Sequence, residues 1–384
     1  MNHLLPQATP ADTATENLLA VLSRHAPDRS FSSADWRGIE QAARRYRVAG
    51  LTLERLRRHG LSAPAEIDAA LRDEGRALAA RAAGNWWLFD GIAAALTAAD
   101  IPFIRLKGSH LARCVYESPS HRFQRDFDIL VHKKHLNQAQ SQIEALGFYR
   151  SQDFEGYNLT FKRDGVPFSL ELHWDVQRRP WLFDIKVSDL WQRAEPAPDG
   201  QGLRLSLEDE IAYLCLHLSK HRFWNEVIPM LDILERLHVQ GERVCYSSLK
   251  RRFEDWHARK PAALVLSVLT KLFPRDTPTE LSRLLPHPPS ALTNYACWRV
   301  SAPDDRNLED RKRMVRIATY RKHQRLWSSL LDSEPGKPRR SRGEKVALLF
   351  GKLGRLGRSL TLAVTGGRLE RTRLSLEKEL CEWC

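Results

Sequence analysis

Two aspartates separated by a single residue carry the clearest chemical signal in this sequence. Asp126 and Asp128 belong to residues 126–131, whose other members are apolar, as in a buried strand. Residues two apart on a strand point to the same face, so the two carboxylates should project together. Adjacent carboxylates repel unless a cation neutralises them, and oxygen ligands suit Mg²⁺ or Mn²⁺. The motif alone therefore predicts either a divalent metal site or a solvated strand end.

A third carboxylate could come from residues 168–175, where apolar and polar side chains alternate. Glu171, His173 and Asp175 share the face opposite the apolar residues. If this strand lies beside residues 126–131, Glu171 can join the two aspartates around a metal that substrate phosphates complete. If Glu171 instead lies on a distant face, His173 or Asp175 becomes the next candidate.

A phosphate-binding turn is the third candidate element. Lys107, Gly108 and Ser109 follow a short apolar run, residues 102–106, where a strand should turn into a helix. Glycine allows the backbone to approach a phosphate, and N–H groups at a helix start offer donors and positive potential. Lys107 could add a cation. Because Gly-Ser pairs are common at such turns, this turn alone is a weak indication.

Taken together, these elements resemble a known family. From about residue 35 to 240 the chain is similar to the uncharacterised nucleotidyltransferase family often called NTP-transferase 5, within the DNA polymerase β-like superfamily. The motifs that carry the resemblance are residues 101–108, Arg122 ahead of residues 126–131, residues 171–174, residues 217–221, Trp224 and Asp232.

The resemblance implies roles for individual residues. Asp126 and Asp128 are expected to bind metal, Glu171 matches the third acidic position, and all three are the catalytic candidates. Gly108 and Ser109 are expected at the triphosphate. The remaining residues expected to bind nucleotide or phosphate are Lys107, Arg122, Arg125, Lys220 and His221. Arg125 replaces a residue that is commonly small in the family, so it either binds phosphate or partly blocks the site.

Two histidines in the later motif allow several interpretations. His217 and His221 lie one helical turn apart and share a face. They could form a polar helix face, line a nucleotide cleft, or supply half of a zinc site that lacks a third ligand. Asp232 is better explained as a structural partner of a nearby Arg or His than as a metal ligand.

The expected reaction transfers a nucleoside monophosphate from an NTP, with ATP as the first choice, to a hydroxyl or phosphate acceptor. Mg²⁺, or Mn²⁺, is the expected cofactor, and the acceptor is a small molecule or a protein. The alternative is a non-catalytic member of the same fold that binds nucleotide or protein, antitoxin-like or regulatory. Nucleic acid is not expected as a partner, because the central region lacks a strong basic stripe.

The pattern along the chain predicts an α+β fold, with a polymerase β-like core and a mixed β-sheet between helical segments. We expect a disordered start at residues 1–15, an N-terminal helical segment at 16–100 and the nucleotidyltransferase core at 101–195. A C-terminal helical domain should follow at 196–332, then a basic linker and tail at 333–384.

Charge is concentrated in the tail. The chain carries 60 Lys+Arg against 47 Asp+Glu, and residues 337–373 contain eleven basic and two acidic residues. Residues 344–364 could contact anionic membrane peripherally, contact RNA, or pack on the body as a solvated helix. Six cysteines without a disulfide framework, and no visible signal peptide, lead us to expect a cytoplasmic protein.

Overall fold

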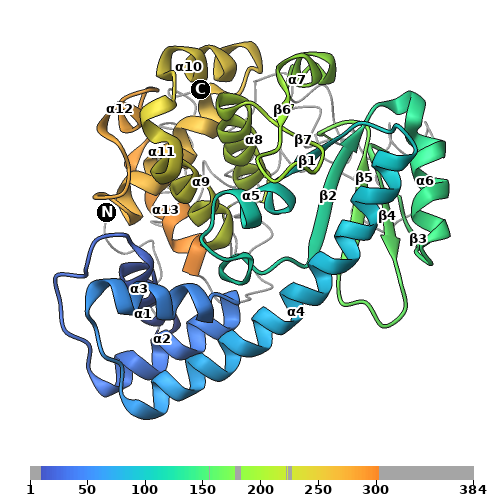
Figure 1. Cartoon of the computed structure of the whole chain (residues 1–384). Coiled ribbons are helices and arrows are strands. Elements are labelled where there is room, and N and C mark those ends of the chain that lie inside the picture. The colour runs from blue at the N-terminus through green and yellow to red at the C-terminus, as the bar shows by residue number, and fades with distance from the viewer. Residues whose placement is uncertain (1–9, 155, 178–182, 222, 224–226, 302–384) are drawn as a thin grey trace, which may run out of the picture.

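The structure, a computed structural model, describes residues 10–301 except for residues 155, 178–182, 222 and 224–226 (Figure 1). The basic linker and tail, with its three possible roles, lies outside the described residues, as does Trp224. Across the described ranges, no helix is both long and apolar enough to cross a lipid bilayer.

Four helices form the N-terminal segment. Their bounds are α1 Pro10–Leu22, α2 Ser33–Tyr46, α3 Ala49–His59 and α4 Ala65–Ala98. Helix α1 begins inside the segment expected to be disordered, because Leu18, Leu19 and Leu22 are buried and anchor it. A capping box between Ser32 and Asp35 starts α2. Helix α4 is 34 residues long and runs from this helical group to the β-sheet (Figure 1).

The centre of the molecule is a mixed sheet of seven strands in the order β3-β4-β5-β2-β1-β7-β6. The strands are β1 Phe103–Leu106, β2 Asp126–Val131, β3 Tyr149–Phe154, β4 Asn158–Lys162, β5 Ser169–His173, β6 Glu195–Pro196 and β7 Leu203–Arg204. Strand β2 pairs antiparallel with β1 and parallel with β5. Helices α5 Gly108–Cys114 and α6 Leu136–Ala145 connect the first strands. This confirms the α+β fold with a mixed sheet.

The sheet extends further along the chain than the pattern indicated. Strands β6 and β7 are two residues each, and β7 pairs parallel with β1. Part of the sheet therefore lies after residue 195, where we expected helical structure to begin. Strands this short leave no alternation of polar and apolar residues to detect.

Aromatic packing fixes the position of strand β2 under helix α4. The Phe127 ring stacks on Phe89 with centroids 4.5 Å apart, and it meets Trp86 edge-on at 4.9 Å. The Phe168 ring also contacts Phe127, with the two ring centroids 4.9 Å apart. Since side chains alternate along a strand, burying Phe127 against α4 directs Asp126 and Asp128 to the opposite face of the sheet.

Seven helices follow β5 in the described part of the chain, and the last six lie between residues 207 and 301. They are α7 Val187–Arg193, α8 Leu207–Lys220, α9 Val227–Gln240, α10 Tyr246–Asp255, α11 Arg259–Leu272, α12 Thr279–Ser282 and α13 Ser290–Ser301. Helix α8 packs against α9, α10 and α11, while α9 also contacts α5 next to the sheet.

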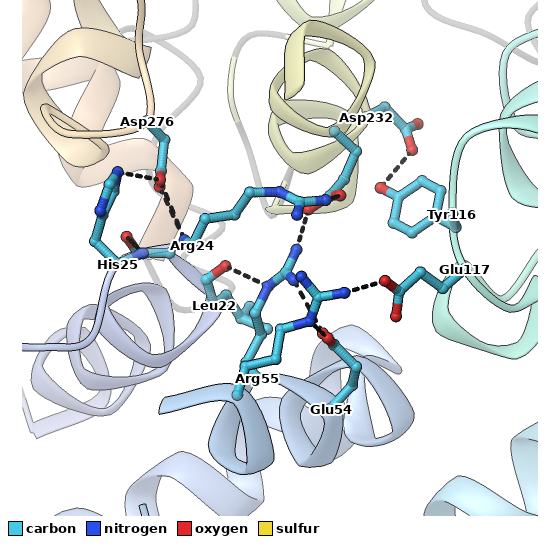
Figure 2. A network of polar contacts seen from close by, with 12 residues as sticks. Leu22, Arg24, His25, Glu54, Arg55, Tyr116, Glu117, Asp232 and Asp276 are labelled. Atoms are coloured by element: carbon cyan, nitrogen blue, oxygen red, sulfur yellow. Dashed lines mark hydrogen bonds and ion pairs between the residues drawn. The ribbon is translucent and has the colours of Figure 1, made fainter. Parts of the chain in front are cut away.

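A group of charged side chains joins the N-terminal helices to α9 and the loop after α5 (Figure 2). Glu235 of α9 pairs with both Arg24 and Arg55, and Arg55 Nη1 donates to Glu54 at 2.9 Å. Arg58 pairs with Glu54 and with Glu117. We call these six residues the interhelix charge network: Arg24, Glu54, Arg55, Arg58, Glu117 and Glu235.

Candidate active site

Strand register brings the predicted acidic residues to one place. Asp128 of β2 is the direct partner of Glu171 on β5, and Asp126 is the partner of Ser169. Because residues two apart share a face, Asp126, Asp128, Glu171 and His173 all lie on the same side of the sheet. The condition set by the sequence pattern, that the strand bearing Glu171 lies beside residues 126–131, is therefore met.

Three of these side chains form a compact cluster. Asp128, Glu171 and His173 each offer a ligand atom, and the three atoms lie within 4.8 Å of one another. His173 Nε2 is 3.0 Å from Asp128 Oδ1 and 3.2 Å from Glu171 Oε2. Asp128 and His173 are buried, whereas the Glu171 side chain is 25% exposed. Two carboxylates and an imidazole make a donor set that suits a divalent cation.

His173 lies closer to the centre of the site than the sequence pattern indicates. The pattern offers it only as a replacement for Glu171, whereas the structure places it in contact with both Asp128 and Glu171. Its Nδ1 is buried and has no hydrogen-bond partner among the described residues. The signal was present in the alternation of residues 168–175, which places His173 on the same face as Glu171.

Lys107 neutralises part of the acidic charge. Its Nζ lies 2.6 Å from Asp128 Oδ1. Burial alone would lower the pKa of Lys107, but Asp128, Asp126 and Glu171 outweigh it and raise that pKa well above its usual value. Burial would likewise raise the pKa of Asp128, but Lys107 and His173 hold it far below its ordinary range. Asp128 is therefore ionised.

Asp126 does not belong to the three-residue cluster, but it is close enough to be influenced by the charges of Asp128, Lys107 and Glu171. It is partly exposed, and its pKa is raised by burial and by the neighbouring Asp128, although Lys107 opposes this effect. A carboxylate whose charged form is disfavoured in the folded protein is stabilised when a cation arrives. Asp126, Asp128 and Glu171 together bring three acids against Lys107 and His173, so negative charge is in excess and the residues present fit a divalent metal.

The turn before α5 is shaped by its neighbours. Lys107 has a positive φ of 48°, an uncommon backbone conformation for a residue other than glycine. A Cβ added to Gly108 would lie 2.7 Å from Arg122 Cζ and 2.9 Å from Gln124 Nε2. A side chain at this position would have to displace the ends of Arg122 and Gln124, which pack directly on the Gly108 Cα. Gln124 is buried, and both atoms of its amide lack a partner among the described residues.

Ser109 and Arg122 have partners within the protein. Ser109 is fully buried, and its Oγ accepts a 2.6 Å hydrogen bond from the backbone N–H of Asp128, which ties the turn to β2. Arg122 donates from Nε and Nη2 to Asp232 at 3.1 and 2.9 Å, and the Tyr116 hydroxyl donates to the same carboxylate. Asp232 is therefore a structural partner, as expected, and it fixes Arg122 over Gly108.

Arg125 lies immediately before β2 and is exposed. Its carbonyl accepts a hydrogen bond from the Ser169 N–H, so the chain is already extended and paired at this point. Alternation along the strand sends the Arg125 side chain toward the α4 side, opposite to Asp126.

The motif at the end of α8 lies near the cluster. Lys220 Nζ donates to the Tyr157 hydroxyl at 3.1 Å, and the Tyr157 ring lies 5.6 Å from the His173 ring. The rings of His217 and His221 are 4.4 Å apart. Burial and the nearby Lys107 lower the pKa of His217 well below its usual value, so this imidazole is neutral. Within the described ranges, the metal-type group of three residues includes neither histidine, so the zinc interpretation gains no support.

Comparison with known proteins agrees with this geometry. No curated protein and no solved structure matches the chain. Residues 32–274, well over half of the chain, match the family described as uncharacterised nucleotidyltransferase. This match spans α2, the sheet and the helices through α11, and it includes every residue of the acidic cluster and of the turn before α5. The protein therefore belongs to this nucleotidyltransferase family.

Proposed function

We propose that the protein is a metal-dependent nucleotidyltransferase that moves a nucleoside monophosphate from an NTP to a hydroxyl or phosphate acceptor. The observation that carries this proposal is the group of acids on the paired strands β2 and β5, beside the turn at Gly108, within a family match that covers both. Mg²⁺ or Mn²⁺ would be held by Asp126, Asp128 and Glu171, with His173 as a further ligand. A bound metal would offset the negative charge that develops on the phosphates.

The protein's own cations would prepare the acidic residues for this task. Lys107 keeps Asp128 ionised through a contact of 2.6 Å, and it also lies close enough to Asp126 and Glu171 to be influenced by both. The partly exposed Glu171 is the acid best placed to meet an acceptor hydroxyl and take its proton. A buried acid such as Asp128 is better suited to holding charge in a fixed position.

Nucleotide phosphates would bind at the turn that contains Gly108. Arg122 is held over Gly108 by Asp232, so its guanidinium is already positioned when an anion arrives. The Gln124 amide, which has no partner among the described residues, lies beside the same glycine and would add a donor that no sequence motif indicates. Ser109 retains a hydroxyl proton to donate. Lys220 and His221 at the end of α8 complete the set proposed to contact the nucleotide, for which ATP is the first choice.

One observation favours a second function, a non-catalytic member that binds nucleotide or protein. Asp128 Oδ1 already contacts both Lys107 Nζ and His173 Nε2, so the protein itself supplies cations to its most buried acid. In a binding protein these internal contacts would take the place of a metal. The two functions differ in whether NTP is consumed.

The test is mass spectrometry of reactions that contain the full chain, each NTP in turn, Mg²⁺ or Mn²⁺, and cell extract. We expect an extract component to gain the mass of a nucleoside monophosphate, together with release of pyrophosphate. Asp128→Asn should abolish this product, whereas Asp73→Asn, which alters an exposed acid on α4, should not. NTP binding with no product in any reaction would instead establish the non-catalytic function.

A further inference from the structure

Two arginines from separate helices lie over one aromatic ring, and a third arginine follows that ring closely in the sequence. The guanidinium carbons of Arg47 and Arg81 lie 5.5 and 5.7 Å from the centroid of the Phe123 ring. Arg47 follows the end of α2, Arg81 lies on α4, and Arg125 is two residues after Phe123. Arg125 is near enough for its charge to lower the pKa of Arg47, after burial, as Arg81 also does. We call Arg47, Arg81 and Arg125 the arginine cluster.

The cluster holds more positive charge than its surroundings balance. Glu74 is the acid that opposes this effect on Arg47, and its two oxygens lie 3.7 Å from Arg81 and 3.6 Å from Arg44. Within the described part of the chain, Arg47 and Arg125 have no ion pair. Arg44 and Arg45, in the last turn of α2, add further positive charge nearby, and Glu40 pairs with Arg44.

The backbone conformation at Arg47 is one that favours glycine. Arg47 ends α2 with φ 58° and ψ 41°, the left-handed conformation in which glycine is the commonest residue. Helix α3 ends in the same conformation with Gly60, at φ 64°. At the end of α2 the chain instead carries a long cation, which is directed onto Phe123 and toward Arg81 and Arg125.

The cluster lies beside the candidate active site but on a different face of the sheet. Arg125 immediately precedes Asp126, and the two side chains leave the strand in opposite directions. The phosphate turn at Gly108 and the acidic residues lie on the Asp126 side. An anion held by the arginine cluster would therefore be separate from the NTP phosphates, although Arg125 and Asp126 are adjacent in the chain.

We propose that the arginine cluster binds a phosphate group on the acceptor. This inference rests on the proposed function, because it names the chemical class of the second substrate. Guanidinium groups form paired hydrogen bonds to phosphate oxygens, and a dianion relieves the repulsion among three arginines. The Phe123 ring contacts the guanidinium groups of Arg47 and Arg81 and so helps to hold them near each other. The acceptor is thus a phosphorylated molecule that is recognised at a point removed from its reacting oxygen.

A binding experiment tests the cluster directly. The full chain is saturated with Mg²⁺ and a non-hydrolysable ATP analogue, and the binding of labelled inorganic phosphate is measured by equilibrium dialysis. We expect Arg47→Gln combined with Arg125→Gln to weaken phosphate binding at least tenfold. Arg125→Gln alone, at an exposed position, should give a smaller loss without affecting the fold. Arg76→Gln, an exposed residue on α4 paired with Asp73, should bind phosphate as the wild type does.

Equal phosphate binding by all of these variants would overturn the proposal. Analogue binding in the same samples reports on the nucleotide site separately, so its absence from the wild-type protein would count against the proposed function instead. A second experiment compares NTP transfer in cell extract with transfer in extract pretreated with alkaline phosphatase, which is removed beforehand. Loss of the product after pretreatment supports a phosphorylated acceptor. Survival of the product, with unchanged acceptor KM in Arg125→Gln, contradicts it.

Discussion

Two regions of this molecule concentrate charged side chains in the interior, and they are built differently. In the interhelix charge network, three arginines face three glutamates: Arg24, Arg55 and Arg58 against Glu54, Glu117 and Glu235 (Figure 2). At the candidate active site, three acids, Asp126, Asp128 and Glu171, face Lys107 and a single histidine.

The electrostatic consequences differ in the same way. Asp126 has a raised pKa, first from burial and then from Asp128, so its negative charge is costly in the folded protein. Glu235, by contrast, accepts from two arginines and is almost completely buried between them. A balanced set of charges holds elements together and needs no further partner. An unbalanced set of acids, as at the candidate active site, indicates a ligand with positive charge.

The largest expected effect is on catalysis. Asp126→Asn should reduce NTP transfer by roughly 10³-fold, because it removes a carboxylate proposed to bind metal. It should leave stability unchanged or raised. The folded-state pKa of Asp126 is raised, so its contribution to stability is present below the pKa of the unfolded chain and lost as pH rises through the folded value. Asparagine does not ionise, so the Asp126→Asn variant does not lose this stability as the pH rises.

Initial rates and thermal melts at pH 4 and pH 7 measure both effects. A variant that stays active would remove Asp126 from the site. A variant that is inactive but also strongly destabilised would show that the acids are structural, as in the interhelix charge network.

The next effect is on stability. Glu235→Gln should destabilise the protein by about 3–5 kcal/mol, because it leaves Arg24 and Arg55 without their shared counter-ion in the interior. Urea unfolding of this variant, with the exposed Glu242→Gln as a control, measures the loss. Metal binding by the protein that remains folded should be unchanged. If Glu235→Gln instead weakened Mn²⁺ binding while leaving stability intact, the two regions would not be separate.

A smaller effect concerns the choice of metal. Imidazole nitrogen is a better ligand for Mn²⁺ and later transition metals than for Mg²⁺. His173→Gln should therefore weaken Mn²⁺ binding by roughly tenfold and Mg²⁺ binding by less. Electron paramagnetic resonance titration of free Mn²⁺ measures the first, and competition with Mg²⁺ the second. The exposed His257→Asn serves as the control. Equal losses for both metals would mean that His173 positions Asp128 and Glu171 without binding metal itself.

Sequence patterns predicted local geometry well and the partners of long side chains poorly. Alternation along two strands placed Asp128 and Glu171 on faces that could meet, and strand pairing brings them together. Nothing in the pattern could place Gln124 and Arg122 on the Cα of Gly108, because that contact depends on how a loop folds back. Pairs such as Arg55 with Glu235, 180 residues apart, are equally invisible to local periodicity.

The smallest expected effect lies at the outer end of the interhelix charge network. Arg58 pairs with Glu117, but their side chains are 36% and 55% exposed, so solvent screens the attraction. Arg58→Gln also removes the pair with Glu54, but Glu54 keeps its contact with Arg55, so the variant should cost less than about 1 kcal/mol, far below the loss expected for Glu235→Gln. The hydrogen bond from Arg58 lowers the pKa of Glu117, so this contribution is present above the unfolded pKa and lost as pH falls through the folded value. NMR titration of Glu117 should show its pKa returning upward in the variant, while urea unfolding near pH 7 changes little. A loss at Arg58 as large as that at Glu235 would mean that the network acts as one cooperative unit, in which burial of the individual pair does not set its strength.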